Sequence, residues 1–390
     1  MAVPEAVGGG HRSSVTAPAI APVASLVRLR SPRPPHPLRL TQTPQQAWSR
    51  PRRYLQAGRQ REPLRPPPEV LAALGSLRFP NVYPDPTNRA LREALAEREN
   101  VDAANLLVGC GADELIDLLL RCVLEPGDVV VDCPPTFTMY AFDADVSAGT
   151  TIAVPRNPDD FSLDLDRTVE AIRRHRAKVI FLTSPNNPDG SLLPDDHLAA
   201  LLREDVLVVL DEAYSEFSGV PSKVGWVARH ENLVVLRTFS KSAALAGLRV
   251  GWGAFPSRLI EYLWRAKQPY NVGVASETAA LAALSNPTYL EDVRNKLVAE
   301  RERMRAALSE RHGAWLTPYP SAANFVLCGV DSAVISPVDL QRRLAEEHGV
   351  MVRHYAKPLM ESYVRVSVGR PDQTDRLMAA LEAIVPGGGK

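Results

Sequence analysis

Several polar residues of this chain have the types and spacing that suit chemistry on a small molecule. In chain order they are the turn Gly111-Ala112-Asp113, then Asn187, the pair Asp211 and Tyr214, then Lys241 and Arg249. A lysine amine can serve first as a nucleophile and then as a general acid or base. A carboxylate can hold a protonated ring nitrogen, while Asn and Tyr side chains donate hydrogen bonds. The turn opens a predicted helix, whose free amides and positive dipole end suit a phosphate.

One cofactor, pyridoxal phosphate, requires all of these groups. Its aldehyde needs a lysine, its pyridine nitrogen a carboxylate, its phenolic oxygen hydrogen-bond donors, and its phosphate amides with an arginine. Each piece alone has a plainer interpretation: residues 184–190 as a strand-to-helix turn, Asp211 with Glu212 as metal ligands, and Lys241 as a surface lysine. No histidine or third carboxylate is spaced to complete a metal site, so no metal is predicted. The ordered set as a whole favours pyridoxal phosphate.

These residues should follow strands, because ligands of open α/β sheets bind just beyond the carboxyl ends of the strands. Five apolar runs are typical of buried parallel strands, at residues 129–133, 178–184, 206–211, 233–239 and 249–255. Helical patterns lie between them, at 113–124, 166–175 and 195–203. Strands that alternate with helices predict a doubly wound, mostly parallel α/β sheet, with Arg249 opening the last of these strands.

A second, smaller α+β part is predicted after Pro287. It begins with a long charged helix at 289–311 and has strand candidates at 324–328, 350–354 and 363–368. We therefore expect a presequence or aberrant segment at 1–66, a large cofactor-binding domain at 67–285 and a small domain at 286–390.

The composition excludes several classes of protein. The 390 residues contain 45 Lys and Arg and 45 Asp and Glu, so no global field points to nucleic acid or a membrane surface. No apolar run reaches the roughly 20 residues that span a bilayer. The four cysteines, Cys110, Cys122, Cys133 and Cys328, form no CxxC motif and no Cys/His cluster, which favours reduced thiols over disulfides or zinc. We expect a soluble intracellular protein.

The first 66 residues have a different composition from the rest. They contain eleven Arg, no Lys, no Asp and only two acids, Glu5 and Glu62. This Arg-rich, acid-poor segment is typical of an organelle transit peptide, which predicts a plastid protein, although an ordinary disordered tail has a similar composition.

Longer motifs make a family resemblance specific. The stretches Ser-Pro-Asn-Asn-Pro-Asp-Gly at 184–190, Asp-Glu-Ala-Tyr at 211–214, Thr-Phe-Ser-Lys at 238–241 and Leu-Ala-Gly-Leu-Arg at 245–249 resemble fold-type I aminotransferases. Gly-Ala-Asp-Glu at 111–114, Cys-Pro-Pro-Thr-Phe at 133–137 and Tyr-Pro-Asp-Pro at 83–86 narrow the resemblance to histidinol-phosphate aminotransferases of the plant or algal type. The resemblance runs from about Pro67 to the C-terminus and implies the fold-type I architecture, a mostly parallel large domain with a smaller α+β domain.

The resemblance assigns roles around the cofactor ring. Lys241 is expected to bind the cofactor covalently and then to move the proton between substrate and cofactor. Asp211 is expected to keep the pyridine nitrogen protonated, and Asn187 and Tyr214 to donate to the phenolic oxygen. Phe137 is expected to stack on the ring, although a plain core aromatic is the alternative.

The resemblance also assigns two anion sites. The cofactor phosphate is expected on the turn at Gly111, with Ser240, Arg249 and Tyr83 of the partner subunit, which implies a homodimer. In the small domain, Arg365 resembles the arginine that holds the α-carboxylate of glutamate, Arg353 a partner of the substrate phosphate, and Asn324 a pocket residue. Packing for Tyr83 and surface salt bridges for the two arginines remain the alternatives.

The chain departs from the family pattern at three places. Ser242 and Ala244 stand where the family often has a basic residue and a glycine. Before residues 67–70 the family carries a segment of the type Lys-Leu-Asp-Ala-Asn-Glu-Asn-Pro-Tyr-Gly-Pro, whereas residues 56–66 of this chain read Gln-Ala-Gly-Arg-Gln-Arg-Glu-Pro-Leu-Arg-Pro. Codons permitted for these residues, read in a frame displaced by a single base, encode the absent motif. We therefore hypothesise that the sequence before about Pro66 is out of frame, which would also account for its composition and would leave a cytoplasmic location open.

The leading interpretation is transamination between L-histidinol phosphate and 2-oxoglutarate in histidine biosynthesis. An aminotransferase for aromatic amino acids or for another phosphorylated amine is the second. The third is an impaired, cofactor-binding pseudoenzyme, which the altered segment before Pro66 favours and the intact set of Lys241, Asp211 and Arg365 opposes.

Overall fold

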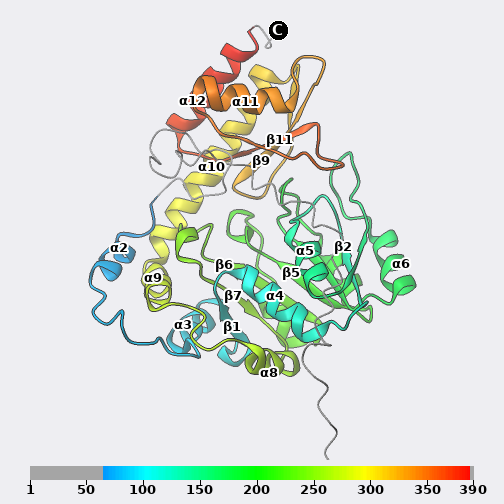
Figure 1. Ribbon diagram of the computed structural model, residues 1–390. Coiled ribbons are helices and arrows are strands. Elements are labelled where there is room, and N and C mark those ends of the chain that lie inside the picture. Colours follow the sequence, from blue (N-terminus) through cyan, green and yellow to red (C-terminus); the bar gives the residue numbers. More distant parts are fainter. Residues whose placement is uncertain (1–64, 387–390) are drawn as a thin grey trace, which may run out of the picture. The chain divides into compact units, whose positions relative to one another are not determined.

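A seven-stranded sheet dominates the architecture of the chain in a computed structural model, which describes residues 65–386 (Figure 1). The segment predicted at 1–66 lies outside the described residues, apart from Arg65 and Pro66. The described residues all belong to one compact unit, Arg52–Lys390. The predicted boundary at 285/286 falls between two helices, α9 (Val274–Leu284) and α10 (Pro287–His312).

The large sheet has the strand order β1-β7-β6-β5-β4-β2-β3. All its strands run parallel except β7, which is antiparallel to both of its neighbours. The strands are β1 (Leu106–Gly109), β2 (Val129–Asp132), β3 (Thr150–Ala153), β4 (Val179–Thr183), β5 (Leu207–Asp211), β6 (Leu233–Thr238) and β7 (Gly251–Ala254). This arrangement confirms the predicted mostly parallel α/β sheet.

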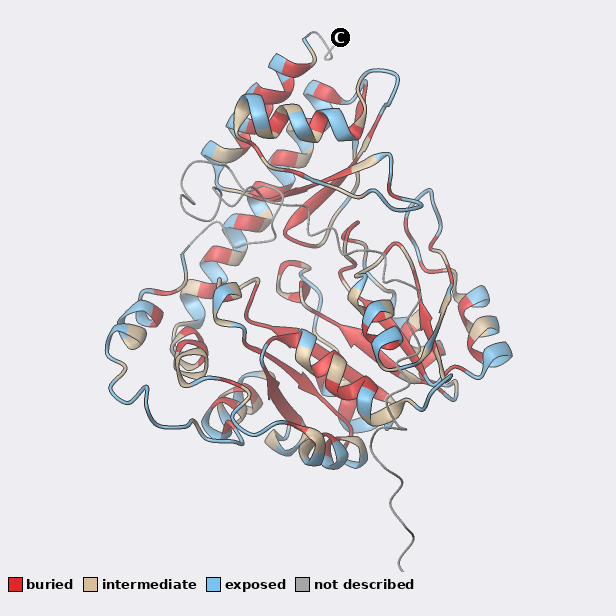
Figure 2. Ribbon diagram, in the orientation of Figure 1, coloured by how far each residue is buried: buried red, intermediate tan, exposed pale blue. Residues whose placement is uncertain are grey.

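Both faces of the large sheet are covered, and strand β4 shows how. Val179 and Phe181 point into one core, whereas Ile180 and Leu182 point into the other, because successive side chains of a strand alternate between faces. Three helices cover the first face: α4 (Ala112–Val123), α5 (Met139–Val146) and α8 (Ser257–Ala266). The second is covered by α3 (Arg89–Glu99), α6 (Leu165–His175), α7 (Asp195–Leu201) and α9, with α2 (Pro68–Gly75) packed on α9. Figure 2 shows the central strands of this sheet almost entirely buried, which explains their continuous apolar runs.

The predicted strands of this sheet are found within two residues of their expected ends, but two strands were not predicted. Strand β1 is only four residues long, and β3 is a half-exposed edge strand without a buried apolar run. The prediction that Arg249 opens a strand is wrong. Arg249 instead ends the short helical turn Ala246–Leu248 in the left-handed region, with φ 50°, and β7 begins two residues later at Gly251.

A second sheet of four strands, with the order β10-β11-β9-β8, belongs to the C-terminal part. Its strands are β8 (Leu316–Pro318), β9 (Phe325–Val330), β10 (Arg353–His354) and β11 (Tyr363–Ser367). Val364 and Val366 lie in the core formed with α10, α11 (Pro337–His348) and α12 (Pro371–Ile384). The alternate residues, among them Leu327 and Tyr363, lie on the opposite face in a separate cluster with Phe161 of the large-sheet part. The short strand β8 was not predicted, and β10 is shorter than predicted.

Candidate active site

The predicted cofactor residues meet at one edge of the large sheet. Strands β1, β2, β4, β5 and β6 run in the same direction, so the loops that follow them share an edge. Because β7 runs the opposite way, the residue Arg249 that precedes it also reaches this edge. In register, Gly251 at the start of β7 lies opposite Gly109 on one side and Thr238 on the other. The antiparallel strand thus places Arg249 between the turn after β1 and Lys241 after β6.

Lys241 is held in a buried environment, with two arginines and two carboxylates around it. Its Nζ lies 5.2 Å from the centroid of the Tyr214 ring. Burial, together with the positive charges of Arg365 and Arg249 and against the carboxylates of Asp113 and Asp211, lowers the pKa of Lys241 to about 8. A substantial fraction of this amine is therefore neutral near physiological pH, which is the nucleophilic form.

Asp211, at the end of β5, is a buried carboxylate with directed partners. Its Oδ2 accepts a hydrogen bond of 2.6 Å from the hydroxyl of Tyr140, and its Oδ1 accepts one of 2.9 Å from the Ala213 amide. Burial raises the pKa of Asp211, and these two hydrogen bonds oppose the rise. Tyr140 is fully buried, stacks on Phe181 with 4.6 Å between ring centroids, and lies 2.8 Å from the hydroxyl of Thr183.

Sequence reasoning missed Tyr140. It lies three residues after Phe137, and the two rings meet edge to face with centroids 5.4 Å apart. The signal was present in the chain, since an aromatic residue with a hydroxyl group at helical spacing from a predicted ring partner is a natural second contact. It was not recognised because helix α5, which carries Tyr140, was not among the predicted elements.

The turn after β1 forms a cradle at the N-terminus of α4. The first amides of α4, as of any helix, have no intrahelical acceptor. Gly111 precedes the helix with φ 83° and has no side chain that could cap them. At this positive φ a residue with a Cβ atom would be strained, and the Cβ would also displace the guanidinium of Arg249, so the position favours glycine. Arg249 donates from Nη2 to Asp113 Oδ2 at 2.8 Å. Ser240, also predicted at the phosphate, is buried beside Lys241 and its amide donates to Thr238 Oγ1 at 3.1 Å.

Strand β11 of the small sheet places Arg365 at this edge. Arg365 is 6% exposed, and its Nη1 donates to Asn187 Oδ1 at 2.6 Å. Its guanidinium carbon lies 5.0 Å from the ring centroid of Phe325, whose ring packs edge to face on Tyr214. Arg353 lies directly opposite Arg365 in register but is exposed. Asn324 is buried, and its Oδ1 has no hydrogen-bond partner within residues 65–386.

The residues at this edge fit pyridoxal phosphate. A depressed-pKa lysine, a buried carboxylate with fixed orientation and an uncapped helix N-terminus beside an arginine are the three features that this cofactor requires. No cluster of three or more His, Cys, Asp or Glu side chains able to hold a metal occurs in the described part of the chain.

The sequence model of the class I and II aminotransferases matches residues 54–381. The chain belongs to this family. The chain is also 59% identical over 320 residues to a chloroplastic histidinol-phosphate aminotransferase of Nicotiana tabacum, covering 82% of this chain and 76% of that relative. It is 43% identical over 327 residues to a histidinol-phosphate aminotransferase of Roseiflexus castenholzii, covering 83% of this chain and 87% of the relative.

Solved aminotransferase structures share the fold. The histidinol-phosphate aminotransferase of Sinorhizobium meliloti, crystallised with pyridoxal-5'-phosphate, superposes with a TM-score of 0.80 at 27% identity, covering 87% of this chain and 93% of that one. The enzyme of that name from Clostridium acetobutylicum gives a TM-score of 0.78 at 23% identity, over 85% of this chain and 98% of its own. Fold and cofactor class are thus those of the pyridoxal-phosphate aminotransferases.

Two residues at this aminotransferase edge depart from the family pattern. Ala244, where the family often has glycine, adopts φ 60°, a left-handed conformation that costs a residue with a Cβ atom about 1 kcal/mol or more. Ser242, where the family often has a basic residue, lines a groove of about 620 Å³ beside Lys241, together with Glu216 and Arg294.

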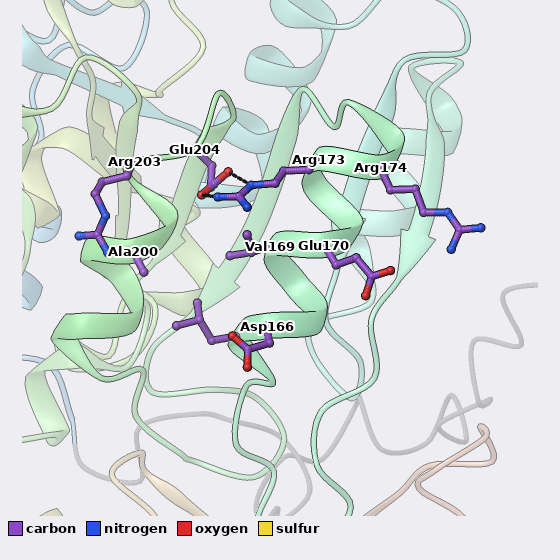
Figure 3. Close-up of a pocket in the computed structure, with 9 residues that line it drawn as sticks. Asp166, Val169, Glu170, Arg173, Arg174, Ala200, Arg203 and Glu204 are labelled. Atoms are coloured by element: carbon purple, nitrogen blue, oxygen red, sulfur yellow. Dashed lines mark hydrogen bonds and ion pairs between the residues drawn. The ribbon is translucent and has the colours of Figure 1, made fainter.

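A wider groove, of about 790 Å³, lies between α6 and the end of α7 (Figure 3). Arg173 and Glu204 reach across it and form a bidentate ion pair, with Nη2 and Oε1 2.7 Å apart. None of the predicted cofactor or substrate residues lines it. The groove is therefore a charged surface feature outside the aminotransferase site.

Proposed function

We propose that this chain transfers the amino group of L-histidinol phosphate to 2-oxoglutarate, which gives imidazole acetol phosphate and glutamate. The observation that carries the proposal is the buried Arg365, joined to Asn187 beside Lys241 with its charge directed at the cofactor edge. Each substrate carries an anionic group that such an arginine can hold, a phosphate in histidinol phosphate and a carboxylate in 2-oxoglutarate. The names of relatives at 59% and 43% identity support the same substrate.

Lys241 is the proposed catalytic residue. Bound pyridoxal phosphate supplies an electron sink that stabilises negative charge at the substrate Cα. The neutral amine of Lys241 first binds the cofactor aldehyde and, once displaced by the substrate amine, takes the proton from Cα and returns it at the cofactor carbon that receives the amino group. A pKa of about 8 suits this role, because the amine can both hold and release a proton near neutral pH.

In the proposed complex, Asp211 and its neighbours hold the cofactor ring. The carboxylate of Asp211 stabilises the protonated pyridine nitrogen. Asn187 accepts from Arg365 through Oδ1, so its amide nitrogen is the group that donates to the phenolic oxygen, together with the hydroxyl of Tyr214. Phe137 stacks on the ring face. Each group acts on a different atom of the same ring, which fixes the orientation of the reacting carbon beside Lys241.

The phosphate of the cofactor is assigned to the cradle at Gly111. The amides of Ala112 and Asp113 and the side chain of Ser240 donate to it, and Arg249 exchanges its exposed ion pair with Asp113 for the phosphate. In the small sheet, Arg365 binds the α-carboxylate of the amino-acid substrate. Arg353 joins it on the phosphate when histidinol phosphate is bound, and Asn324 lines the pocket.

A half-reaction tests the proposal directly. The purified protein is loaded with pyridoxal phosphate, and histidinol phosphate alone is added while the visible absorbance of the lysine-bound cofactor is followed. We expect the band to disappear as the pyridoxamine form accumulates, with phenylalanine reacting more slowly. Lys241→Ala is the control and should show neither the initial band nor the conversion. A band that histidinol phosphate leaves unchanged and phenylalanine removes would contradict the proposed substrate.

We also propose that the enzyme is a homodimer in which Tyr83 of the partner subunit reaches the cofactor phosphate. Tyr83 is 78% exposed and stacks on Tyr270 with 4.6 Å between centroids, and the neighbouring apolar side chains of Phe79, Val82 and Leu71 are 54 to 66% exposed. Apolar side chains gathered in this way on the surface favour a protein interface. Analytical ultracentrifugation should give twice the monomer mass, and Tyr83→Phe should weaken cofactor binding without dissociating the dimer.

For localisation we propose the plastid, as for relatives named chloroplastic. The N-terminal residues on which this proposal and the frame hypothesis rest are outside the described range 65–386. Fusing residues 1–66 to a fluorescent protein tests the transit function. Sequencing the transcript across codons 56–66 tests the frame, and a transcript whose frame runs unbroken from Gln56 through Pro68 would reject the frame hypothesis.

A further inference from the structure

Tyr355 lies between the two arginines of the small sheet. It follows strand β10 directly, and it packs in the cluster of Leu327, the register partner of Arg365 on strand β9. Its ring centroid is 5.5 Å from the guanidinium carbon of Arg353 and 5.7 Å from that of Arg365. Both distances are within the roughly 6 Å over which an aromatic ring attracts a cation. The ring thus contacts both arginines and separates two like charges.

The hydroxyl of Tyr355 is buried and has no hydrogen-bond partner among residues 65–386. The Nε of Arg365 is likewise buried and has no hydrogen-bond partner among residues 65–386. Burial raises the pKa of Tyr355, against the opposing effect of the two arginines, so the phenol keeps its proton and is a hydrogen-bond donor at neutral pH. A buried donor left without an acceptor is costly, so such a group is completed by an ordered water or by a ligand.

Packing accounts for the ring of Tyr355 but not for its hydroxyl. The ring packs against the apolar cluster of Phe161, Leu327 and Met360. A phenylalanine would fill this space equally well and would leave no buried donor. Tyr363, on the same face, differs in this respect, because its hydroxyl is hydrogen-bonded to Tyr319.

We propose that the Tyr355 hydroxyl donates a hydrogen bond to the phosphate of the substrate, as a third donor beside Arg353 and Arg365, while its ring holds the two guanidinium groups in place. The inference rests on the proposed function and extends it to a residue that determines specificity. A carboxylate offers two oxygens, which one arginine can hold, whereas a phosphomonoester offers three terminal oxygens. The third donor therefore favours phosphorylated substrates over carboxylates.

The test uses the holoenzyme with the matched variants Tyr355→Phe and Tyr363→Phe, each of which removes a single hydroxyl. We expect Tyr355→Phe to raise the KM for histidinol phosphate about tenfold and to leave kcat and the KM for glutamate within about twofold. Tyr363→Phe should change none of these values. An unchanged KM for histidinol phosphate in Tyr355→Phe would overturn the inference, and so would an equal rise for both substrates, which would indicate a general effect on Arg365.

Binding of inorganic phosphate separates this inference from the proposed function. Calorimetric titration of the holoenzyme with inorganic phosphate should show about tenfold weaker binding in Tyr355→Phe than in the parent and in Tyr363→Phe. This result would support the inference even if histidinol phosphate proved not to be a substrate. Equal phosphate affinity in all three proteins would reject the role of Tyr355 whatever the reaction is.

Discussion

Two buried arginines of this molecule differ in whether carboxylates compensate their charge. Arg237, on strand β6, is 5% exposed and has three carboxylate partners, with Glu216 at 2.9 Å, Glu212 at 3.4 Å and Glu99 at 3.8 Å. Arg365, on strand β11, is 6% exposed, and within residues 65–386 it has no carboxylate at ion-pair distance; its polar partner is the neutral Asn187.

This difference distinguishes an arginine whose charge the fold compensates from one that is left to bind a ligand. Although burial acts to lower the pKa of Arg237, the three carboxylates raise it, so this charge is compensated by the fold itself. Arg237 precedes Lys241 by four residues, and Glu212 and Glu216 flank Tyr214, so the cluster joins the two segments that carry the cofactor residues. At Arg365 the missing negative charge is the one that a substrate would bring.

Removing Arg237 is expected to have the largest effect. Arg237→Met removes the common partner of the buried Glu212 and of the partly buried Glu99 and Glu216, which should cost about 3–5 kcal/mol of stability. Urea unfolding of the purified protein measures the loss. Arg121→Met, which breaks an exposed ion pair with Asp117 on helix α4 instead, is the control and should cost less than about 1 kcal/mol. Equal losses in the two variants would show that the buried cluster contributes nothing special.

Removing Arg365 should affect activity without affecting stability. Arg365→Met deletes a buried charge that the fold does not compensate, so the unfolding free energy should change by less than about 1 kcal/mol. The kcat/KM for glutamate should fall about 100-fold or more, because two charge-assisted hydrogen bonds to the carboxylate are lost. A large loss of stability would instead place Arg365 with Arg237, as part of the structure.

Removing the Tyr140 hydroxyl tests whether the loss of a neutral hydrogen-bond partner at the cofactor edge also affects function, as the loss of Arg365 should. Tyr140→Phe removes the 2.6 Å hydrogen bond to Asp211 and keeps the stacked ring. The pKa of Asp211, already raised by burial, should rise further, so the carboxylate holds the pyridine nitrogen less well. We expect cofactor affinity, measured by equilibrium dialysis, to weaken about 10- to 30-fold. Thr183→Val, which removes the hydrogen bonds of Thr183 to Tyr140 and Thr136 but keeps the bond from Tyr140 to Asp211, should have a smaller effect.

The uncompensated charge of Arg365 should also affect the pH dependence of cofactor uptake. Only neutral Lys241 attacks the cofactor, so the rate at which the apoprotein takes up pyridoxal phosphate should rise about tenfold between pH 7 and 9, with a midpoint at about 8. Because the positive charge of Arg365 helps to lower the pKa of Lys241, the midpoint should move to higher pH in Arg365→Met. Arg353→Met, an exposed arginine of the same face, is the control. An unmoved midpoint in Arg365→Met would show that the charge of Arg365 does not contribute to the lowered pKa of Lys241.

The smallest effect is expected at the turn after Lys241, where the cost lies in the backbone rather than in charge. Ala244→Gly relieves the left-handed conformation at φ 60°, but it also loosens the unfolded chain. The net gain in stability should be about 0.5 kcal/mol, measured by urea unfolding with activity unchanged. A loss of stability would mean that the Ala244 methyl group makes a packing contact worth more than the strain.

Much of the fold and the family could be read from local patterns. The continuous apolar runs that became β2, β4, β5 and β6 are visible in the sequence because each strand is covered on both faces. The motifs around Asn187, Asp211 and Lys241 are short and contiguous, so their resemblance to the aminotransferases was recognisable and is confirmed by the family match. The assigned roles of the individual residues stay predictions.

The sequence by itself thus determined the central strands, the cofactor class and the residues at the ends of those strands, since these depend on neighbours within a few positions. Only the tertiary structure decided which distant side chains meet. Tyr140 reaches Asp211 across 71 positions and Arg365 reaches Asn187 across 178, and Arg249 joins the cradle because β7 runs antiparallel. Whether a buried arginine is compensated or left open for a ligand depends on such long-range contacts, because charges act through space and not along the chain.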